Sequence, residues 1–142
     1  MPNKKTKQIT PSQRSPAVLP HCKIWVEIDG EVLLSAWRID LLEAVDNTGS
    51  LARAARQLKV PYRTAWYKLH AIERQLGTKL IATQSGGKQG GGSQLTQEAR
   101  QLIEHFHRVS AGVSELVEQR FRNEFGHLFP LLQRSAGRFP VS

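Results

Sequence analysis

The chain has 142 residues, of which 39% are apolar, so it can form one globular domain with additional tails. Its 20 Lys and Arg residues outnumber its 12 Asp and Glu residues, and the net charge of +8 favours a polyanionic partner, either nucleic acid or an acidic membrane surface. The single cysteine excludes an internal disulfide framework and the usual cysteine-rich zinc sites, and no apolar run is long enough to cross a membrane.

Residues 1–22 predict a disordered basic tail. They hold four bases and no acid, and they are rich in Lys, Gln, Ser, Thr and Pro. They lack the apolar run that a secretory signal requires, and the lone Cys22 fits a reducing compartment. We therefore expect a cytoplasmic protein.

The remaining charge is distributed unevenly along the chain. Residues 23–49 hold two bases and six acids, whereas residues 50–94 hold eight bases and a single acid, Glu73. A face that is merely solvated usually mixes the two signs. The excess of positive charge in one central segment therefore favours a specific anionic partner for that segment.

A β-hairpin and a helix are expected first. Residues 23–28 alternate, with Ile24, Val26 and Ile28 on one side. Asp29-Gly30 follows, which is the strongest short signal for a hairpin turn, and residues 31–34 form the returning strand. Residues 35–47 then place apolar side chains at helical spacing, and Gly49 is suited to ending that helix.

Two further helices follow in close succession. Ser50 is a favourable N-cap for a helix that ends near Leu58, and the turn 59–61 leads to a third helix that Gly77 ends. Pro61 suits the first position of the third helix, because its missing N–H has no intrahelical partner there. Four apolar residues of this helix share one narrow stripe and predict its buried face: Ala65, Leu69, Ile72 and Leu76.

Two short helices joined by a tight turn, the second basic on its outer face, predict a helix-turn-helix, whose second helix enters the major groove of DNA. Arg63 suits bidentate contact with guanine, and Thr64 and Tyr67 can form hydrogen bonds. Tyr62 and Trp66 offer apolar contact or stacking. The alternative is a plain three-helix bundle with a solvated basic face. Separately, we expect Trp66 to be partly buried, because a large aromatic side chain at the edge of a buried stripe is more often packed than exposed.

A glycine-rich segment after the third helix predicts a wing. Five of the seven residues in Gly86–Gly92 are glycine, and strand-like stretches flank the segment at 79–83 and near Leu95. Glycine lets a backbone approach phosphate closely, and Lys88 supplies one charge there. The alternatives are a surface loop, or a nucleotide-binding P-loop, which is disfavoured because Gln89 stands where Ser or Thr is required.

The expected DNA interface combines both short helices and the wing. Ser50 would place a helix N-terminus near a phosphate group. The residues predicted to contact DNA are Ser50, Arg53, Tyr62, Arg63, Thr64, Trp66, Tyr67, Lys68 and Lys88.

The C-terminal part predicts one long helix, capped by Thr96, over residues 97–125, and then a tail, 126–142. Its apolar residues repeat with a heptad period, which is typical of helix pairing. We expect this seam to hold a homodimer through Leu102, Phe106, Val109, Val113 and Leu116. Gly112 weakens the helix by about 1 kcal/mol relative to Ala. The alternative is that the helix packs on its own domain, and a second apolar stripe allows both uses.

No catalytic or metal-binding arrangement stands out, so we expect neither an enzyme nor a cofactor or metal ion. His105 and His107 are two residues apart and therefore point to different sides of a helix. His21-Cys22 lies in the tail, and the carboxylates around Asp29 lie at a hairpin turn.

The pattern from Gly49 to Gly77, followed by Leu95-Thr96, resembles the LysR-type winged helix-turn-helix. The run Tyr62-Arg63-Thr64-Ala65-Trp66 and the Gly86–Gly92 segment more narrowly resemble the N-terminal DNA-binding domain of the ModE family of molybdate-dependent bacterial regulators. The resemblance covers about residues 23–110.

This resemblance implies a mainly α fold, with a winged helix-turn-helix over 23–96 that begins with the β-hairpin. It also implies a homodimer that reads a palindromic operator in double-stranded DNA. The sequence departs from the family at Pro61, where Ser is usual, and at Thr83-Gln84, where an acidic-basic pair is usual. Too few residues follow Thr96 for the family's molybdate-binding domain, so no molybdate site is expected in this chain.

Two functions therefore compete. The first is a dimeric DNA-binding transcriptional regulator that reads DNA through helix 61–76. The second is a winged-helix module that binds another protein and has no sequence-specific affinity for DNA. Neither hypothesis involves a membrane partner.

Overall fold

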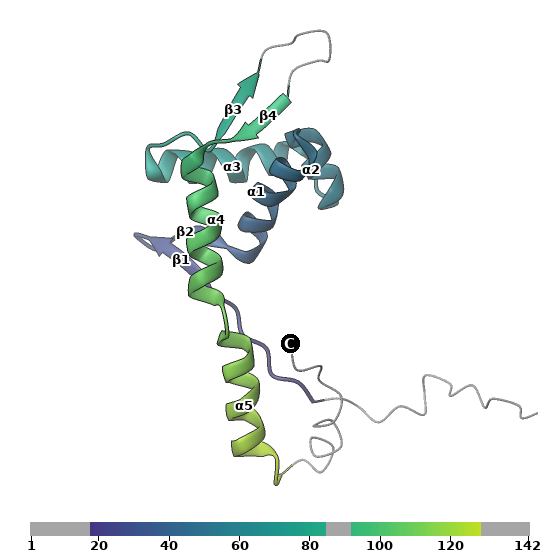
Figure 1. The fold of residues 1–142 in the computed structure, drawn as a ribbon, viewed down its shortest axis with the longest axis vertical. Helices are drawn as coiled ribbons and strands as arrows, with labels where there is room; N and C mark the ends of the chain where they lie inside the picture. Colours follow the sequence, from purple (N-terminus) through teal and green to yellow (C-terminus); the bar gives the residue numbers. More distant parts are fainter. Residues whose placement is uncertain (1–17, 85–91, 129–142) are drawn as a thin grey trace, which may run out of the picture. The chain divides into compact units, whose positions relative to one another are not determined.

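The structure is a computed structural model that describes residues 18–84 and 92–128. By contacts the chain divides into two compact units, residues 23–111 and residues 1–22 with 112–142. The elements in chain order, drawn in Figure 1, are β1 (Trp25–Ile28), β2 (Glu31–Ser35), α1 (Ala36–Thr48), α2 (Leu51–Gln57), α3 (Tyr62–Leu76), β3 (Ile81–Gln84), β4 (Gly92–Leu95), α4 (Gln97–Ser110) and α5 (Val113–Phe125).

The predicted N-terminal hairpin is confirmed. Strands β1 and β2 pair antiparallel, and Asp29 and Gly30 form the turn with φ of 50° and 81°. Two successive residues with positive φ give the turn the right-handed twist that a two-residue hairpin requires. All four residues of β1 are exposed, whereas Leu33 and Leu34 of β2 are buried, so β2 joins the hairpin to the core.

Arg38 of α1 secures the hairpin to the helix that follows it. Its guanidinium donates to the backbone carbonyl of Leu33, and Ser35 caps the helix by accepting from the Arg38 N–H. Burial lowers the pKa of Arg38, and the nearby carboxylate of Glu31 opposes that change.

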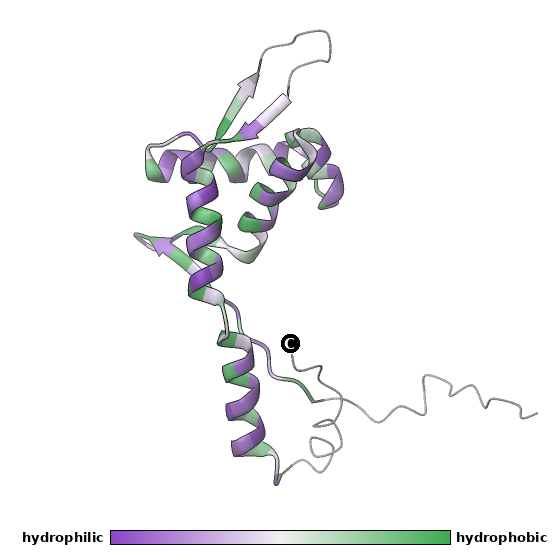
Figure 2. Ribbon diagram, viewed as in Figure 1, coloured by the Kyte–Doolittle hydropathy of each residue, from purple (hydrophilic) through white to green (hydrophobic). Residues whose placement is uncertain are grey.

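The core of residues 23–111 lies where α1, α2 and α3 meet, with contributions from β2, the wing strands and α4. Hydrophobic and hydrophilic residues alternate around α3 and α4 in Figure 2, as amphipathic helices require. The fully buried large side chains are Ile39, Leu41, Leu42, Val45, Leu69, Ile72 and Leu80. The small pair Ala54-Ala55 on α2 is also buried, and small side chains allow close approach of helices.

Strands β3 and β4 form the base of the predicted wing. They pair antiparallel from Ile81↔Leu95 to Gln84↔Gly92, and their hairpin projects from the helices in Figure 1. The Ser93 N–H donates to the Gly49 carbonyl, with an N to O distance of 2.8 Å, so the wing is attached to the turn between α1 and α2. The predicted contact residue Lys88 lies outside the described residues.

The prediction of one continuous helix over 97–125 is wrong. Helix α4 ends at Ser110, Ala111 is extended with ψ of 129°, and Gly112 has φ of 75°. A residue in the left-handed region cannot continue a right-handed helix, and glycine adopts that conformation without a Cβ clash. Helix α5 then begins at Val113, so the heptad seam is divided between two helices.

The two C-terminal helices differ in how they are packed. Helix α4 buries Ala99 and Phe106 in the core of residues 23–111, and its Arg100 and His107 contact Asp46 and Glu43 of α1. Helix α5 has no buried residue, although Phe121 and Phe125 stack on each other. Within 18–84 and 92–128, no helix has the length and apolar character needed to cross a membrane.

Candidate nucleic-acid interface

The turn between α2 and α3 has the tight geometry that the sequence predicts. Ser50 caps α2 by accepting from the Arg53 N–H, and Lys59 has a φ of 57°. The Val60 N–H donates to the Ala55 carbonyl, which closes the turn. Pro61 is the N-cap residue of α3, because its ψ of 144° is extended, and not the first helical residue that the sequence predicts.

Helix α3 has one buried face and one exposed face. Ala65, Leu69 and Ile72 are fully buried, which confirms the predicted core stripe, and Leu76 is partly buried. Residues 63, 67 and 74 lie on the opposite side at helical spacing, and all three are exposed. The helix is therefore held by one side and presents the other.

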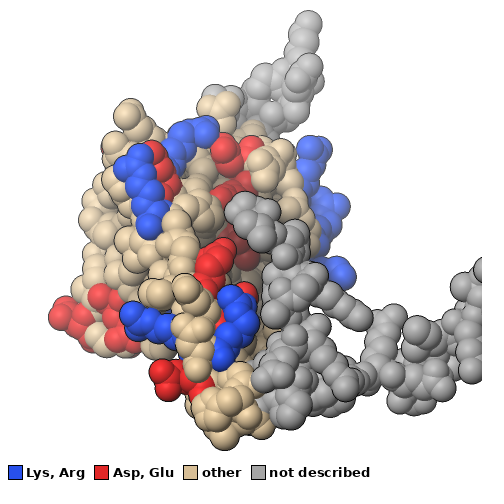
Figure 3. Space-filling model, turned by 60° about the horizontal axis from the view of Figure 1, so that its bottom comes forward, with Lys and Arg blue, Asp and Glu red and all other residues tan. Residues whose placement is uncertain are grey.

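The exposed charges on residues 50–83 all have the same sign. Seven bases in this stretch are exposed: Arg53, Arg56, Lys59, Arg63, Lys68, Arg74 and Lys79. The only acid there, Glu73, has an exposed fraction of 7% and is therefore removed from the surface. Figure 3 shows one face of the molecule, on which both Lys and Arg side chains and Asp and Glu side chains are exposed.

Aromatic side chains lie among these bases on α3. Tyr67 is 61% exposed and Trp66 is 41% exposed, so the Trp66 side chain is partly buried, as expected at the edge of the core stripe. Their ring centroids are 6.1 Å apart in an edge-to-face arrangement, and the Arg74 guanidinium lies 5.9 Å from the Tyr67 centroid. The Trp66 ring also lies 4.1 Å from that of His70, centroid to centroid. These contacts restrain both exposed rings.

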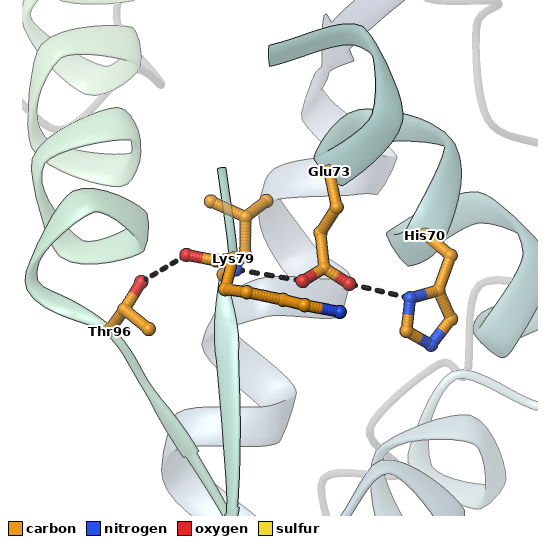
Figure 4. A network of polar contacts seen from close by, with 5 residues as sticks. His70, Glu73, Lys79 and Thr96 are labelled. Atoms are coloured by element: carbon orange, nitrogen blue, oxygen red, sulfur yellow. Dashed lines mark hydrogen bonds and ion pairs between the residues drawn. The ribbon is translucent and has the colours of Figure 1, made fainter. Parts of the chain in front are cut away.

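A buried carboxylate connects α3 to the wing. The Leu80 N–H donates to Oε2 of Glu73 at 3.0 Å, and Nδ1 of His70 lies 2.5 Å from Oε1. Figure 4 shows the carboxylate between the His70 ring and the backbone at Lys79–Leu80. The Thr96 hydroxyl donates to the Lys79 carbonyl on the other side. Glu73 thus fixes the strand that leads into the wing relative to α3.

A groove of about 460 Å³ separates α3 from the wing. Tyr62 and Trp66 line it from α3, Leu51 from α2, and Thr83 and Ser93 from the wing strands. Lys79 adds a positive charge to its wall. The exposed face of α3, the groove and the base of the wing therefore form one continuous surface that is basic and partly aromatic.

Most of the predicted DNA-contacting residues are exposed on α2 and α3, and Tyr62 and Trp66 also line the groove. Ser50 is half-buried as a helix cap, and Thr64 is half-buried near the start of α3. The others that the structure describes are exposed: Arg53, Tyr62, Arg63, Trp66, Tyr67 and Lys68.

The predicted dimerisation residues do not share one environment. Phe106 is buried within its own unit, and Leu102 packs against that core. Val109 at the end of α4 is 63% exposed, and Leu116 on α5 is exposed. Val113 is half-buried at the start of α5.

Sequence reasoning assigned no role to Glu73 or His70. The signal was present, because Glu73 is the single acid among the eight bases of residues 50–94. A lone acid three residues after a histidine on a helix is a candidate for a local pair. In residues 18–84 and 92–128, no three His, Cys, Asp or Glu side chains are grouped so that they could hold a metal ion.

Three helices with a tight turn between the second and third, followed by a two-stranded hairpin, define a winged helix-turn-helix domain. Residues 38–100 match the family described as "Bacterial regulatory helix-turn-helix protein, lysR family". This segment is therefore similar to the LysR-type helix-turn-helix, in agreement with the broader resemblance.

Curated relatives are molybdenum-related regulators and transport proteins by name. The molybdenum-pterin-binding protein MopB of Rhodobacter capsulatus is 36% identical over 84 residues, which are 59% of this chain and 31% of the relative. The molybdenum transport protein ModE of Azotobacter vinelandii is 36% identical over 78 residues, 55% of this chain and 29% of the relative. The transcriptional regulator ModE of Haemophilus influenzae is 32% identical over 79 residues, which are 56% of this chain and 31% of the relative. The chain thus spans about a third of the length of these relatives.

Proposed function

We propose that this chain is a transcriptional regulator that binds double-stranded DNA. The observation that carries the proposal is the charge of the surface formed by α2, α3 and the base of the wing, where every exposed charged residue from 50 to 83 is a base. A surface of one positive sign on a helix-turn-helix is the footprint expected for a phosphate backbone. The names of the relatives, which include transcriptional regulators, agree with it.

In this proposal α3 enters the major groove and reads base edges. Arg63 lies at the exposed N-terminal end of α3, where a guanidinium can donate two hydrogen bonds to guanine. Arg53 and Lys68, exposed on α2 and α3, are placed to contact phosphate groups beside the groove. Lys88 in the glycine-rich segment would contribute charge at a phosphate or in the minor groove.

We also propose that the chain works as a homodimer on a palindromic operator. Two copies related by a twofold axis would place their α3 helices about one turn of DNA apart, roughly 34 Å. Phe106 is buried in the core of its own unit and Leu102 packs against that core, so among the predicted seam residues Val109, Val113 and Leu116 are the candidates for contact with a partner. Val109→Lys or Val113→Lys should produce monomers in sedimentation, whereas the wild type should sediment as a dimer.

We infer that the chain catalyses no reaction and that it acts in the cytoplasm, where bacterial DNA is found. The names of its relatives describe regulation, transport and binding.

The dependence of duplex binding on salt tests the function most directly. If a dimer neutralises about 6–8 phosphates, log K should fall against log salt with a slope of about −5 to −7. Selection of duplexes from a random DNA pool should enrich a palindrome. A protein-interaction module would instead give neither binding at low salt nor an enriched sequence, and that result would exclude the proposal.

A further inference from the structure

Trp66 and Tyr67 form an aromatic patch on α3 that stays largely outside the hydrophobic core. Both are exposed, while the core residues Ala65 and Leu69 on the same helix are fully buried. A contiguous apolar patch rimmed by charged side chains is typical of an interaction site. The patch lies beside the exposed bases of α3, so its partner has to be polyanionic and partly apolar.

The patch is preorganised rather than mobile. Trp66 is fixed by its contacts with His70 and Tyr67, and His70 lies against the buried carboxylate of Glu73. Arg74 lies over the Tyr67 ring at 5.9 Å. Restraining a side chain before binding reduces the entropy that complex formation loses. A surface fixed in this way suits contact with one defined apolar group.

Duplex DNA presents one apolar group in its major groove, the C5-methyl group of thymine, and apolar side chains contact it. Resting on the proposed function, we propose that the Trp66–Tyr67 patch reads thymine through this methyl group. Tyr67 provides the main contact, because it is the more exposed ring and lies on the same side of α3 as Arg63. Trp66 supports it from the side that faces the groove next to the wing.

The test uses the full chain and a duplex selected with it from random DNA. Each thymine of that duplex is replaced in turn by deoxyuridine, which lacks only the methyl group and keeps the same base-pairing edge. At one or two positions in each half-site, binding should weaken about fourfold, the effect of burying one methyl-sized group. Replacement by 5-bromodeoxyuridine at the same positions should restore affinity, because bromine fills the space of the methyl group.

Three variants connect the effect to the patch. Tyr67→Ala should bind the thymine and uracil duplexes equally at those positions, whereas Tyr67→Phe should still discriminate, because the ring face and not the hydroxyl makes the contact. Trp25→Ala removes another exposed aromatic residue, 54% exposed on β1, and should discriminate as the wild type does. Circular dichroism and thermal unfolding should show that all three variants are folded.

Several results would overturn the inference. Equal affinity of the wild type for thymine and uracil duplexes at every position would do so, and this result would leave the proposed DNA-binding function intact. Full discrimination by Tyr67→Ala would reject the assignment to this patch. Loss of discrimination in Tyr67→Phe would assign the effect to a hydroxyl contact instead. Failure to select any duplex would reject the inference together with the proposed function.

Discussion

The two faces of α3 differ in what they hold. The inner face places Leu69 and Ile72 in the core, and its only acid, Glu73, lies buried against the wing. The outer face presents Arg63 and Tyr67 to solvent. Residues on one side of this 15-residue helix thus stabilise the fold, and residues on the opposite side are available to bind DNA. Substitutions on one side should therefore leave the other side's property largely unchanged.

Truncating the inner face should have the largest effect. Leu69 is fully buried, so Leu69→Ala should lower the free energy of unfolding by about 2–5 kcal/mol through lost burial and a residual cavity. Urea unfolding measures the change. The folded fraction should keep its preference among DNA sequences, because Leu69 does not reach the outer face. A changed sequence preference at conditions where the variant is folded would show that the two faces are not separable.

Glu73 stabilises the junction of α3 and the wing, and its removal should have the next largest effect. Glu73→Ala leaves the buried Leu80 N–H without an acceptor and should lower stability by about 1–3 kcal/mol. Glu73→Gln keeps an acceptor oxygen and should lose less. Hydrogen exchange of the Leu80 amide should speed up in the alanine variant and remain slower in the glutamine variant. Equal exchange in both would contradict the role of this hydrogen bond.

The hairpin, the caps and the core stripe of α3 could be predicted because each depends on local sequence. Asp29-Gly30 and Gly77 adopt positive φ, and Ser50 and Thr96 accept the hydrogen bonds that orphan N–H groups need. Turn and cap chemistry involves only a few neighbouring residues, so the sequence contains all of it.

The C-terminal helix could not be predicted in the same way. The heptad period continues through Gly112, but periodicity does not reveal whether a core in the same chain or a partner covers each apolar residue. Phe106 is buried within its own unit, and the left-handed backbone of Gly112 interrupts the helix between α4 and α5. The Glu73 contact depends on Leu80, seven residues away across the turn that ends α3, so helical spacing alone did not indicate it.

A change on the outer face should affect binding and leave stability almost unaltered. Arg63→Ala should weaken binding to the best operator by about 1–3 kcal/mol and relax the preference at one base position. Its free energy of unfolding should change by less than about 0.5 kcal/mol, because the side chain is exposed. Parallel measurements on the operator and on a scrambled duplex separate the two kinds of contact. Equal weakening on both duplexes would identify Arg63 as a phosphate contact.

The smallest change is expected at Lys68, which is exposed on α3 directly before the buried Leu69. An ammonium group on a flexible chain acts as a point charge, so it suits a phosphate better than a base edge. Lys68→Ala should weaken the operator and the scrambled duplex by similar factors and reduce the salt slope by about one for each site contacted. Lys68→Arg retains the charge and should keep the wild-type slope. If Lys68→Ala instead lowered the free energy of unfolding as Leu69→Ala does, stability and DNA binding would not be separated between the two faces of α3, even at two adjacent residues.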